Sequence, residues 1–370
     1  MRIRNTRLVC LLAGVCVSTI GGCPSNPSDG AGQSNGTWSA LSSGMDWTVN
    51  ALTVYNGQLI AGGLFTHAGE LTVIHVAAWN GSSWSALGDG TNGGSVDALA
   101  VYNGRLIAGG DFTTAGGVAA NHIAAWDGTS WAPLGDGTNH SVEALAVFNN
   151  QLIAGGVFST ADNTGANGIA AWDGTSWTPL GTGIGGSVPF SSALSPFVST
   201  LTVYNGQLIA GGGFTTAGAA NVMNVAAWDG AAWSPLGSGL GAGGVIALTV
   251  YNGQLIAGGG FNTSGAVAVP CVAVWDGTSW TAPGGGTNAS VYALTVQNGQ
   301  LVAGGLFTAA GGTSAAYLAA WNGTAWSALG SGASNSVESF ADFNGQLIVG
   351  GDFTTAGGVT TNGIVSTILP

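Results

Sequence analysis

The side chains that could act as acids, bases or metal ligands are few in this chain. It has four histidines and three glutamates, and each of its four basic residues is an arginine. His67, Glu70 and His75 lie close together in sequence, and with His122 or His140 they form the one group suited to proton transfer. No nucleophile motif, phosphate-binding loop or paired-carboxylate signature accompanies them. We therefore assign no catalytic residue, cofactor or metal ion, and an enzyme is the less favoured interpretation.

Two aspartates stand at equivalent places in a repeated loop. Asp89 and Asp136 each belong to the sequence Leu-Gly-Asp-Gly-Thr-Asn, and Asp111 and Asp352 each follow a glycine pair. Oxygen-rich loops can bind calcium, but none of these loops has the dense alternating acidic residues of a dedicated calcium site. We expect these aspartates to cap turns. Asp89, Asp136 and the four histidines stay candidate binding residues, because these positions differ from unit to unit.

The residue that opens the third strand of each repeated unit varies in a way that suggests a metal site. This position carries, in chain order, His75, His122, Gly168, Asn224, Cys271, Tyr317 and Gly363. Histidine and cysteine are zinc ligands. The third strand is nevertheless expected about 10 Å outside the innermost one, where equivalent residues of neighbouring units diverge. We therefore expect no metal ion here.

A repeat that runs through most of the chain must position these residues. A Gly-Gly pair recurs with its first glycine at positions 62, 109, 155, 211, 258, 304 and 350, so the period is close to 46 residues. In residues 95–110 an alternating apolar segment leads through Asn-Gly into a nearly continuous apolar one, the strongest short-range signal of a β-hairpin. A second hairpin, residues 123–134, turns at Asp127-Gly128. Each unit is therefore expected to have four strands.

Two tryptophans flank the second turn in six of the units. The pairs are Trp79 and Trp84, Trp126 and Trp131, Trp172 and Trp177, Trp228 and Trp233, Trp275 and Trp280, and Trp321 and Trp326. A carbohydrate-binding platform is one interpretation. We favour packing between units, because residues repeated in every unit are better explained by a shared structural role. The phenylalanine that follows each glycine pair has the same explanation.

The two ends of the repeat region determine the expected architecture. Residues 337–367 provide three strands of a last unit, and residues 36–44 match its missing fourth strand. An N-terminal strand that completes the last unit would remove two exposed sheet edges. We therefore predict an all-β fold: a seven-bladed β-propeller of four-stranded antiparallel blades over residues 36–370, closed by the N-terminal strand.

The glycine pair followed by spaced aromatic residues resembles the Kelch repeat, although tryptophan replaces the usual tyrosine. The sequences GGxFTTAGG, IAAWDGTSW and LGxG are still more similar to the propeller repeats of fungal cortical cell-polarity markers and of uncharacterised bacterial surface lipoproteins. The resemblance covers residues 36–370 and implies a propeller with ligand sites on the face of the long loops. It implies little about activity, because propellers host unrelated functions.

The first residues predict export and a lipid anchor. Three arginines precede an apolar run over residues 8–20, which is too short to span a bilayer as a stable helix. Residues 1–22 therefore read as a signal peptide, and their end resembles the lipobox of bacterial lipoproteins, with isoleucine for the usual leucine. The resemblance implies a lipid on Cys23, an anchor in the cell envelope and, from Pro24, the outer membrane. Residues 23–35 would then be the lipidated cysteine and a flexible tether.

The charge of the exported chain limits its partners. Without the signal peptide, Arg105 stands against sixteen acidic residues, a formal charge of −15. Nucleic-acid binding relies on lysine and arginine to neutralise phosphates, so no nucleic-acid partner is expected. The charge favours a soluble, self-repelling surface, and we expect a monomer. Cys271 has no partner for a disulfide once the signal peptide is removed and Cys23 is acylated.

The long connections are expected on one face of the disc, opposite the tight hairpins. Loops on a rigid scaffold are where binding groups usually lie. The connection over residues 181–200 is ten residues longer than its counterparts and brings Phe190 and Phe197 to this face. It is either an apolar partner surface or a loop that folds back over the central opening and packs there.

We predict a membrane-anchored, extracytoplasmic propeller that acts through its long-loop face as a non-catalytic binding or scaffold module for a protein or a glycan. Two alternatives stay open. A carbohydrate-binding or carbohydrate-active propeller predicts histidines and acidic groups clustered at the centre of that face. A purely structural envelope protein predicts a smooth face lined by Ser, Thr and Gly. The near-identity of the units favours binding or structure, because catalytic sites usually break repeat symmetry.

Overall fold

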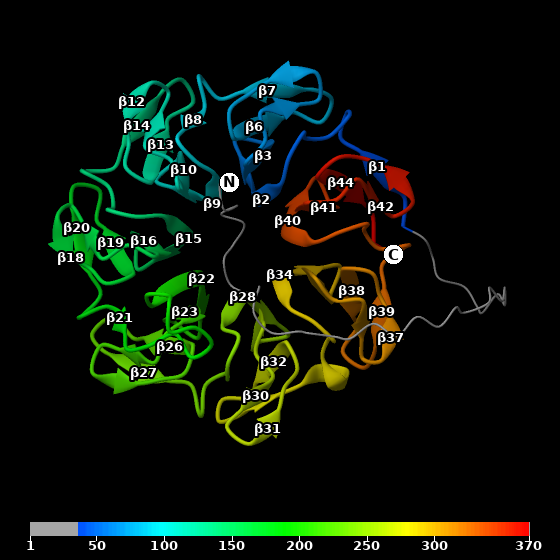
Figure 1. The fold of residues 1–370 in the computed structure, drawn as a ribbon. Helices are drawn as coiled ribbons and strands as arrows, with labels where there is room; N and C mark the ends of the chain where they lie inside the picture. The colour runs from blue at the N-terminus through cyan, green and yellow to red at the C-terminus, as the bar shows by residue number, and fades with distance from the viewer. Residues whose placement is uncertain (1–35, 370) are drawn as a thin grey trace, which may run out of the picture.

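The computed structural model describes residues 36–369, and these residues are all-β apart from one short 3-10 turn, η1 (Pro283–Gly285). The described chain contains seven four-stranded antiparallel sheets, arranged around a central axis (Figure 1). From the axis outward, the first sheet has β2 (Val49–Tyr55), β3 (Gln58–Gly63), β6 (Val76–Trp79) and β7 (Trp84–Ala86).

The next five sheets repeat this order from the axis outward. Their strands are β9 (Val96–Tyr102), β10 (Arg105–Gly110), β13 (Ile123–Trp126) and β14 (Trp131–Pro133); β15 (Val142–Phe148), β16 (Gln151–Gly156), β19 (Ile169–Trp172) and β20 (Trp177–Pro179); β22 (Phe197–Tyr204), β23 (Gln207–Gly213), β26 (Val225–Trp228) and β27 (Trp233–Pro235); β28 (Val245–Tyr251), β29 (Gln254–Gly259), β32 (Val272–Trp275) and β33 (Trp280–Thr281); and β34 (Val291–Gln297), β35 (Gln300–Gly305), β38 (Leu318–Trp321) and β39 (Trp326–Ala328).

The last sheet combines the two ends of the described chain. Its strands, from the axis outward, are β40 (Val337–Phe343), β41 (Gln346–Gly351), β44 (Ile364–Thr367) and β1 (Trp38–Ala40). Thr367 lies opposite Leu347 of β41 on one side and opposite Trp38 of β1 on the other. Each innermost strand contacts those of the neighbouring sheets, and β40 contacts β2.

Turn chemistry separates the two faces of the disc. The first-to-second hairpins turn through residues with positive φ, such as Asn103 (48°) and Gly104 (73°), as a type I′ turn requires. We call the face with these turns and the third-to-fourth turns the hairpin face.

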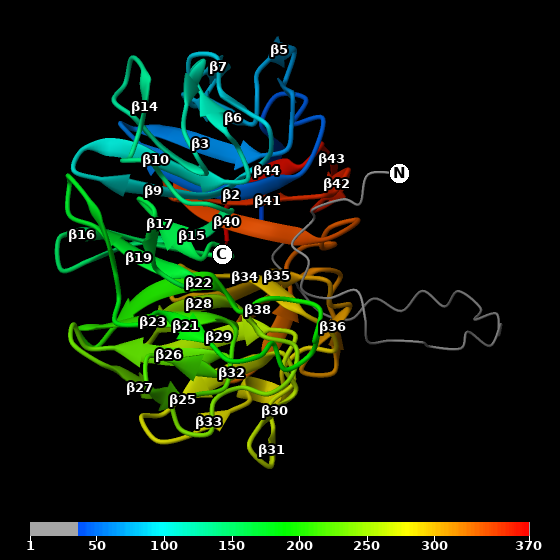
Figure 2. The ribbon, with the colours of Figure 1, turned by 60° about the vertical axis from the view of Figure 1, so that its left-hand side comes forward.

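The opposite, long-loop face carries short ladders in the second-to-third connections, two of them extended by a strand of a sheet-to-sheet connection. They are β4 (His67–Ala68) and β5 (Leu71–Thr72); β8 (Thr91–Asn92), β11 (Thr114–Ala115) and β12 (Val118–Ala119); β17 (Thr160–Ala161) and β18 (Thr164–Gly165); β21 (Ile184–Gly185), β24 (Thr216–Ala217) and β25 (Ala220–Asn221); β30 (Thr263–Ser264) and β31 (Val267–Ala268); β36 (Ala309–Ala310) and β37 (Thr313–Ser314); and β42 (Thr355–Ala356) and β43 (Val359–Thr360). Figure 2 shows β36, β42 and β43 toward its right-hand side.

The repeated glycines and aromatic residues pack the sheets against one another. A Cβ atom on Gly109 would lie 2.6 Å from Cγ1 of Val142 in the neighbouring sheet, so glycine allows the close approach. The phenylalanines that follow the glycine pairs are at most 3% exposed, which places them in the core.

The tryptophan pairs also pack between sheets. Their ring centroids are 5.1–5.5 Å apart, and the second ring of each pair is at most 8% exposed. The second indole donates a hydrogen bond of 2.8–3.2 Å to a carbonyl of the preceding sheet's outer edge, as Trp131 Nε1 does to Leu87 O. The packing interpretation of these pairs is therefore what the geometry supports, and they do not form an exposed platform.

Candidate functional site

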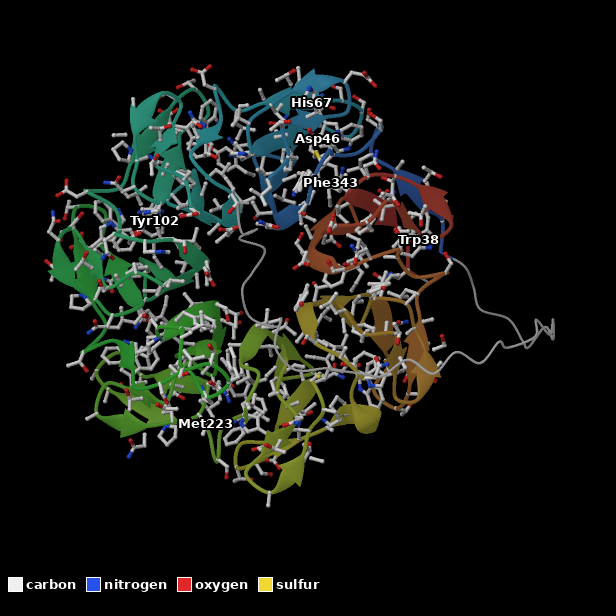
Figure 3. The ribbon with its side chains drawn as sticks, in the orientation of Figure 1. Trp38, Asp46, His67, Tyr102, Met223 and Phe343 are labelled. Atoms are coloured by element: carbon white, nitrogen blue, oxygen red, sulfur yellow. The ribbon has the colours of Figure 1, made fainter. Side chains whose placement is uncertain are left out.

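The first histidine of the expected acid–base group ties down a loop. His67, in β4, is half exposed, and its Nδ1 lies 3.1 Å from Oδ2 of Asp46 (Figure 3). The Asp46 carboxylate also accepts hydrogen bonds from the backbone N–H groups of Thr66 and His67, at 2.7 and 2.8 Å, and from the Thr66 hydroxyl at 2.6 Å. Asn139 and Asn288 accept the same pair of backbone bonds in the third and sixth units. This arrangement is a loop anchor that recurs along the chain.

The acidity of Asp46 follows from these donors. Partial burial alone would raise its pKa, but the hydrogen bonds from Thr66 and His67 stabilise the ionised form and lower the pKa to about 2. The carboxylate is therefore ionised at neutral pH and serves as an acceptor, which is a structural role.

The position that opens the third strand is a left-handed turn in every unit. Its seven residues, which the sequence suggested as a metal column, have φ between 61° and 79°. Each donates its backbone N–H to the carbonyl of the preceding phenylalanine, as His75 does to Phe65 and Cys271 to Phe261. Asn224 is fully buried, with its amide nitrogen bonded to Leu240 O and Gly241 O. The shared property of this column is therefore backbone conformation.

Two of the predicted histidines come together, on neighbouring sheets. The rings of His122 and His140 are stacked with centroids 6.2 Å apart, and Nδ1 of His122 lies 3.8 Å from Oδ1 of Asp111. Burial lowers the pKa of His122, and Asp111 opposes that shift. Burial also lowers the pKa of His75, whose Nδ1 lies 3.4 Å from the Thr91 hydroxyl. The lowered pKa values favour the neutral form of His75 and His122 at pH 7.

The two loop aspartates have different surroundings. Asp136 accepts a hydrogen bond from Asn163 Nδ2 at 3.1 Å, and its own N–H donates to Asp162 Oδ1 at 2.6 Å. It belongs to a loop-capping network between the third unit's loops. Asp89 is exposed, as is Glu70 at the tip of the first unit's long loop. Within residues 36–369, no group of three or more His, Cys, Asp and Glu side chains is arranged to hold a metal ion.

The long connection over residues 181–200 packs against the disc. Phe197 is only 5% exposed in β22, and Phe190 meets it edge-on, with ring centroids 6.4 Å apart. Both rings lie beside Gly213, and Phe190 also lies beside Gly244 of the next unit. Val188 is buried as well. The segment therefore packs against the disc, as the second interpretation expects, although no contact places it over the central opening. Phe197 is not accessible to a partner, because it fills the space beside Gly213.

A position that differs in chemistry between units lies at the start of each innermost strand. Each of these strands has a β-bulge near its first residues, at the end that adjoins the long-loop face. The bulged residues, which we call the bulge ring, are Asn50, Asp97, Glu143, Ser199, Ile246, Tyr292 and Glu338. Their order along the chain is also their order around the axis.

Polar members of the bulge ring are neighbours in space. Asn50 Nδ2 donates to Asp97 Oδ1 at 2.8 Å across the first two sheets. Glu338 precedes Asn50 around the axis and Glu143 follows Asp97, because β40 contacts β2 and β9 contacts β15. Three of these four residues are carboxylic acids, so this side of the bulge ring is acidic, although Glu338 is only 6% exposed and accepts a hydrogen bond from the Ser336 hydroxyl at 2.8 Å. The other side has Ser199 and Ile246, which are buried.

An exposed tryptophan stands beside this acidic side. Trp47 is 51% exposed and precedes β2, three positions before Asn50. In the same way, His140 lies three positions before Glu143, and Asn335 lies three positions before Glu338. Asn335 donates to Asp352 at 3.3 Å. We call Trp47, His140 and the acidic members of the bulge ring the axial site.

One column of the repeat carries a sequence signal for the axial site. The residue after the first valine of each unit reads Asn, Asp, Glu, Ser, Ile, Tyr and Glu, whereas the flanking positions are nearly constant. Variation at one column of a regular repeat indicates a role outside the shared packing. The bulge at this column is not visible in the apolar alternation, because one extra residue shifts the alternation.

Comparisons with known proteins address the fold. A model of a β-propeller domain of unknown function, DUF5122, matches residues 344–365. The crystal structure of the WD40 β-propeller domain of Doa1 superposes with a TM-score of 0.52 at 15% identity, over 89% of this chain and 96% of that one. The fold is a β-propeller.

A second solved structure, the computationally designed Ika8 protein, gives a TM-score of 0.51 at 16% identity and covers 90% of this chain and 99% of that one. No curated protein sequence matches this propeller. Among residues 36–369, no helix is long and apolar enough to cross a membrane. The predicted lipidation site, Cys23, lies outside the described residues.

Proposed function

We propose that the propeller has seven blades and is closed by β1, and that its repeats are of the Kelch-like type. The pairing of β1 with β44 and the contact of β40 with β2 support the closure. The glycine pairs and spaced aromatic residues support the Kelch-like assignment. In this arrangement the bulge ring surrounds the end of a central opening, and its seven positions face one ligand site.

We propose that the protein is a non-catalytic binding module that acts through the axial site on its long-loop face. The observation that carries this proposal is the concentration of variable residues there. Six residue types, all polar except Ile246, occupy the seven positions of the bulge ring, whereas the packing positions of the same units are nearly identical. Rigid strands position these groups, which favours recognition of a ligand over a purely structural role.

The chemistry of the axial site indicates the class of ligand. Asp97, Glu143 and Glu338 create a negative potential, which favours hydrogen-bond donors and cations and disfavours phosphate or sulfate. Trp47 offers an aromatic face, which suits the apolar side of a sugar or the cationic side chain of a peptide. A carbohydrate ligand is the second candidate because of Trp47, and a basic peptide segment of a protein is the first because of the three carboxylates.

The location of the protein is a further part of this proposal. We propose cleavage after residue 22, a lipid on Cys23 and an anchor in the bacterial outer membrane, with residues 23–35 as a tether. The bound protein would be a monomer whose only membrane contact is the lipid. Mass spectrometry of the purified protein tests the anchor: Cys23→Ala should remove the lipid mass and release the protein from membranes.

Binding of the full chain to peptide and glycan arrays tests the axial site. Trp47→Ala and Glu143→Gln should each weaken binding about tenfold, because they remove an aromatic contact and a charge from the site. Glu70→Gln is the matched control, since it removes an exposed carboxylate on a long loop away from the axis. Equal binding by Trp47→Ala, Glu143→Gln and the unchanged protein would contradict the proposal.

A further inference from the structure

A cavity of about 340 Å³ lies between the last sheet and the first, away from the axial site. Asn344, in the turn between β40 and β41, and Gly81, in the turn between β6 and β7, line it. Both turns belong to the hairpin face, so the cavity is on the side of the disc opposite the long loops. Ligand pockets have volumes from about 300 Å³ upward, so this cavity is at the small end of that range.

The cavity coincides with two departures from the repeat. The residue that ends the innermost strand is Tyr55 in the first sheet and Tyr102 in the second, and their hydroxyls donate to Gly104 O and Asn150 O of the next sheet. The last sheet has Phe343 here, as the third sheet has Phe148, and a phenylalanine has no hydroxyl to bond the next sheet's turn. Figure 3 shows Phe343 between these two sheets.

The second departure adds a polar group to the cavity wall. In each sheet, one residue of the third strand lies opposite the central isoleucine or valine of the second strand. This residue is alanine in five of the seven sheets, Val274 in the sheet of β28 to β33, and Ser366 in the last sheet. Ser366 is 5% exposed and donates its hydroxyl to Ser39 O at 3.2 Å. Its oxygen keeps acceptor capacity for a ligand hydroxyl.

The remaining lining combines aromatic rings with neutral polar groups. Trp79 and Phe343 provide ring surfaces, and Asn344 and Gln346 provide amides that both donate and accept hydrogen bonds. No lining residue carries a charge. A charged ligand would lose its hydration without an opposite charge, which is costly. A neutral ligand with several hydroxyls and one apolar side matches these groups.

We propose that this cavity binds a neutral sugar residue, such as the terminal unit of a glycan. The ring of Trp79 packs against the apolar side of the sugar, and Ser366, Asn344 and Gln346 exchange hydrogen bonds with its hydroxyls. This site is independent of the axial site, because it lies on the opposite face and uses none of the same residues.

Binding of free monosaccharides to the full chain tests this proposal. Calorimetry and saturation-transfer NMR would use glucose, galactose, mannose and N-acetylglucosamine as probes. At least one of them should bind the unchanged protein. Ser366→Val should abolish this binding because it removes the hydroxyl and narrows the cavity, with a side chain that the fifth sheet already accommodates as Val274.

Gln346→Ala should weaken binding about tenfold by removing one hydrogen-bonding group. Gln58→Ala is its matched control: Gln58 is the equivalent residue of the first sheet and faces the second, so binding should not change. Circular dichroism checks the fold of each variant. Absence of binding by all four sugars, or unchanged binding by Ser366→Val or Gln346→Ala, would overturn the proposal. Trp47→Ala should leave this binding intact, which separates it from the axial site.

Discussion

Thr361 and Thr367 are both buried near the end of the chain, but only one has a hydrogen-bonding partner. The Thr361 hydroxyl donates to Ile364 O. The Thr367 hydroxyl has none among the described residues, at 1% exposure. A buried hydroxyl without a partner keeps its full desolvation cost, so the same substitution should have opposite effects at the two positions.

Thr367→Val should increase the free energy of unfolding by about 1 kcal/mol, since valine has the same shape without the hydroxyl. Thr361→Val should decrease it by about 1–2 kcal/mol, because it removes a bond and leaves Ile364 O unsatisfied. Urea denaturation of both variants measures these changes. Destabilisation of equal size by both would show that Thr367 has an acceptor after all.

The loop anchor at Asp46 predicts an effect of pH on stability. The folded pKa is about 2, below the value of about 4 for an unfolded aspartate. The stabilisation from the ionised carboxylate is therefore fully present above pH 4 and is lost as the pH falls through 2. In Asp46→Asn, the amide oxygen should still accept the backbone bonds, as Asn139 does. The unchanged protein should have a slightly higher melting temperature than Asp46→Asn at pH 7; the difference is small because Asp46 is 40% exposed. This difference in melting temperature should vanish near pH 2.

Melting temperatures of both proteins between pH 2 and pH 7 measure this difference. An advantage that grows as the pH falls would contradict the assigned role of Asp46. The control is Asp89→Asn, whose carboxylate is exposed and should not change the slope of the acid limb.

At the scale of strands and turns, the close packing of sheets depends on the glycine pairs. A Cβ atom on Gly109 would clash with Val142, whereas a Cβ atom on Gly104 would meet nothing within 4 Å. Gly109→Ala should therefore lower the free energy of unfolding by about 1–3 kcal/mol through overpacking. Gly104→Asn should cost much less, because Asn tolerates a φ of 73° and Asn150 occupies the equivalent turn of the third unit. Thermal unfolding compares them, and equal losses would refute the packing argument.

The predictable parts of this fold are those with one physical cause. An Asn-Gly turn needs two positive φ angles, so the sequence predicted the hairpins correctly. The third-strand column suggested metal ligands only by its residue types, because its residues share a left-handed backbone and no side-chain chemistry: His75, Asn224 and Cys271 satisfy it equally. The bulge ring was missed because a bulge changes which face a residue occupies. The pairing of Asp46 with His67 joins segments that are distant in sequence, and a single sequence gives no signal for it.

The junction of the last two sheets differs from the other junctions of the molecule. Thr367 occupies the place of the first tryptophan of each pair, opposite Trp38. Trp38 Nε1 has no hydrogen-bond acceptor among the described residues, whereas its six counterparts each donate to the preceding sheet. The ring of Trp38 lies against Gly357 and Gly330 instead. This junction lacks one tryptophan ring and one indole hydrogen bond that the other junctions have. We therefore expect the stability of the whole disc to depend on the pairing of β1 with β44.

Deletion of residues 36–41 tests that conclusion for the whole molecule. It removes β1 and Trp38, exposes the edge of β44 and leaves the last sheet with three strands. Loss of a fully buried tryptophan costs about 3–5 kcal/mol, and the loss of the partly buried Trp38 should cost less. An exposed strand edge also pairs with other chains. We therefore expect a lower melting temperature together with association that light scattering detects. Deletion of residues 24–35 is the control, because it retains β1 and should change neither property. If the first deletion leaves both the melting temperature and the molecular mass unchanged, β1 does not close the propeller, and the seven positions of the bulge ring do not surround one site.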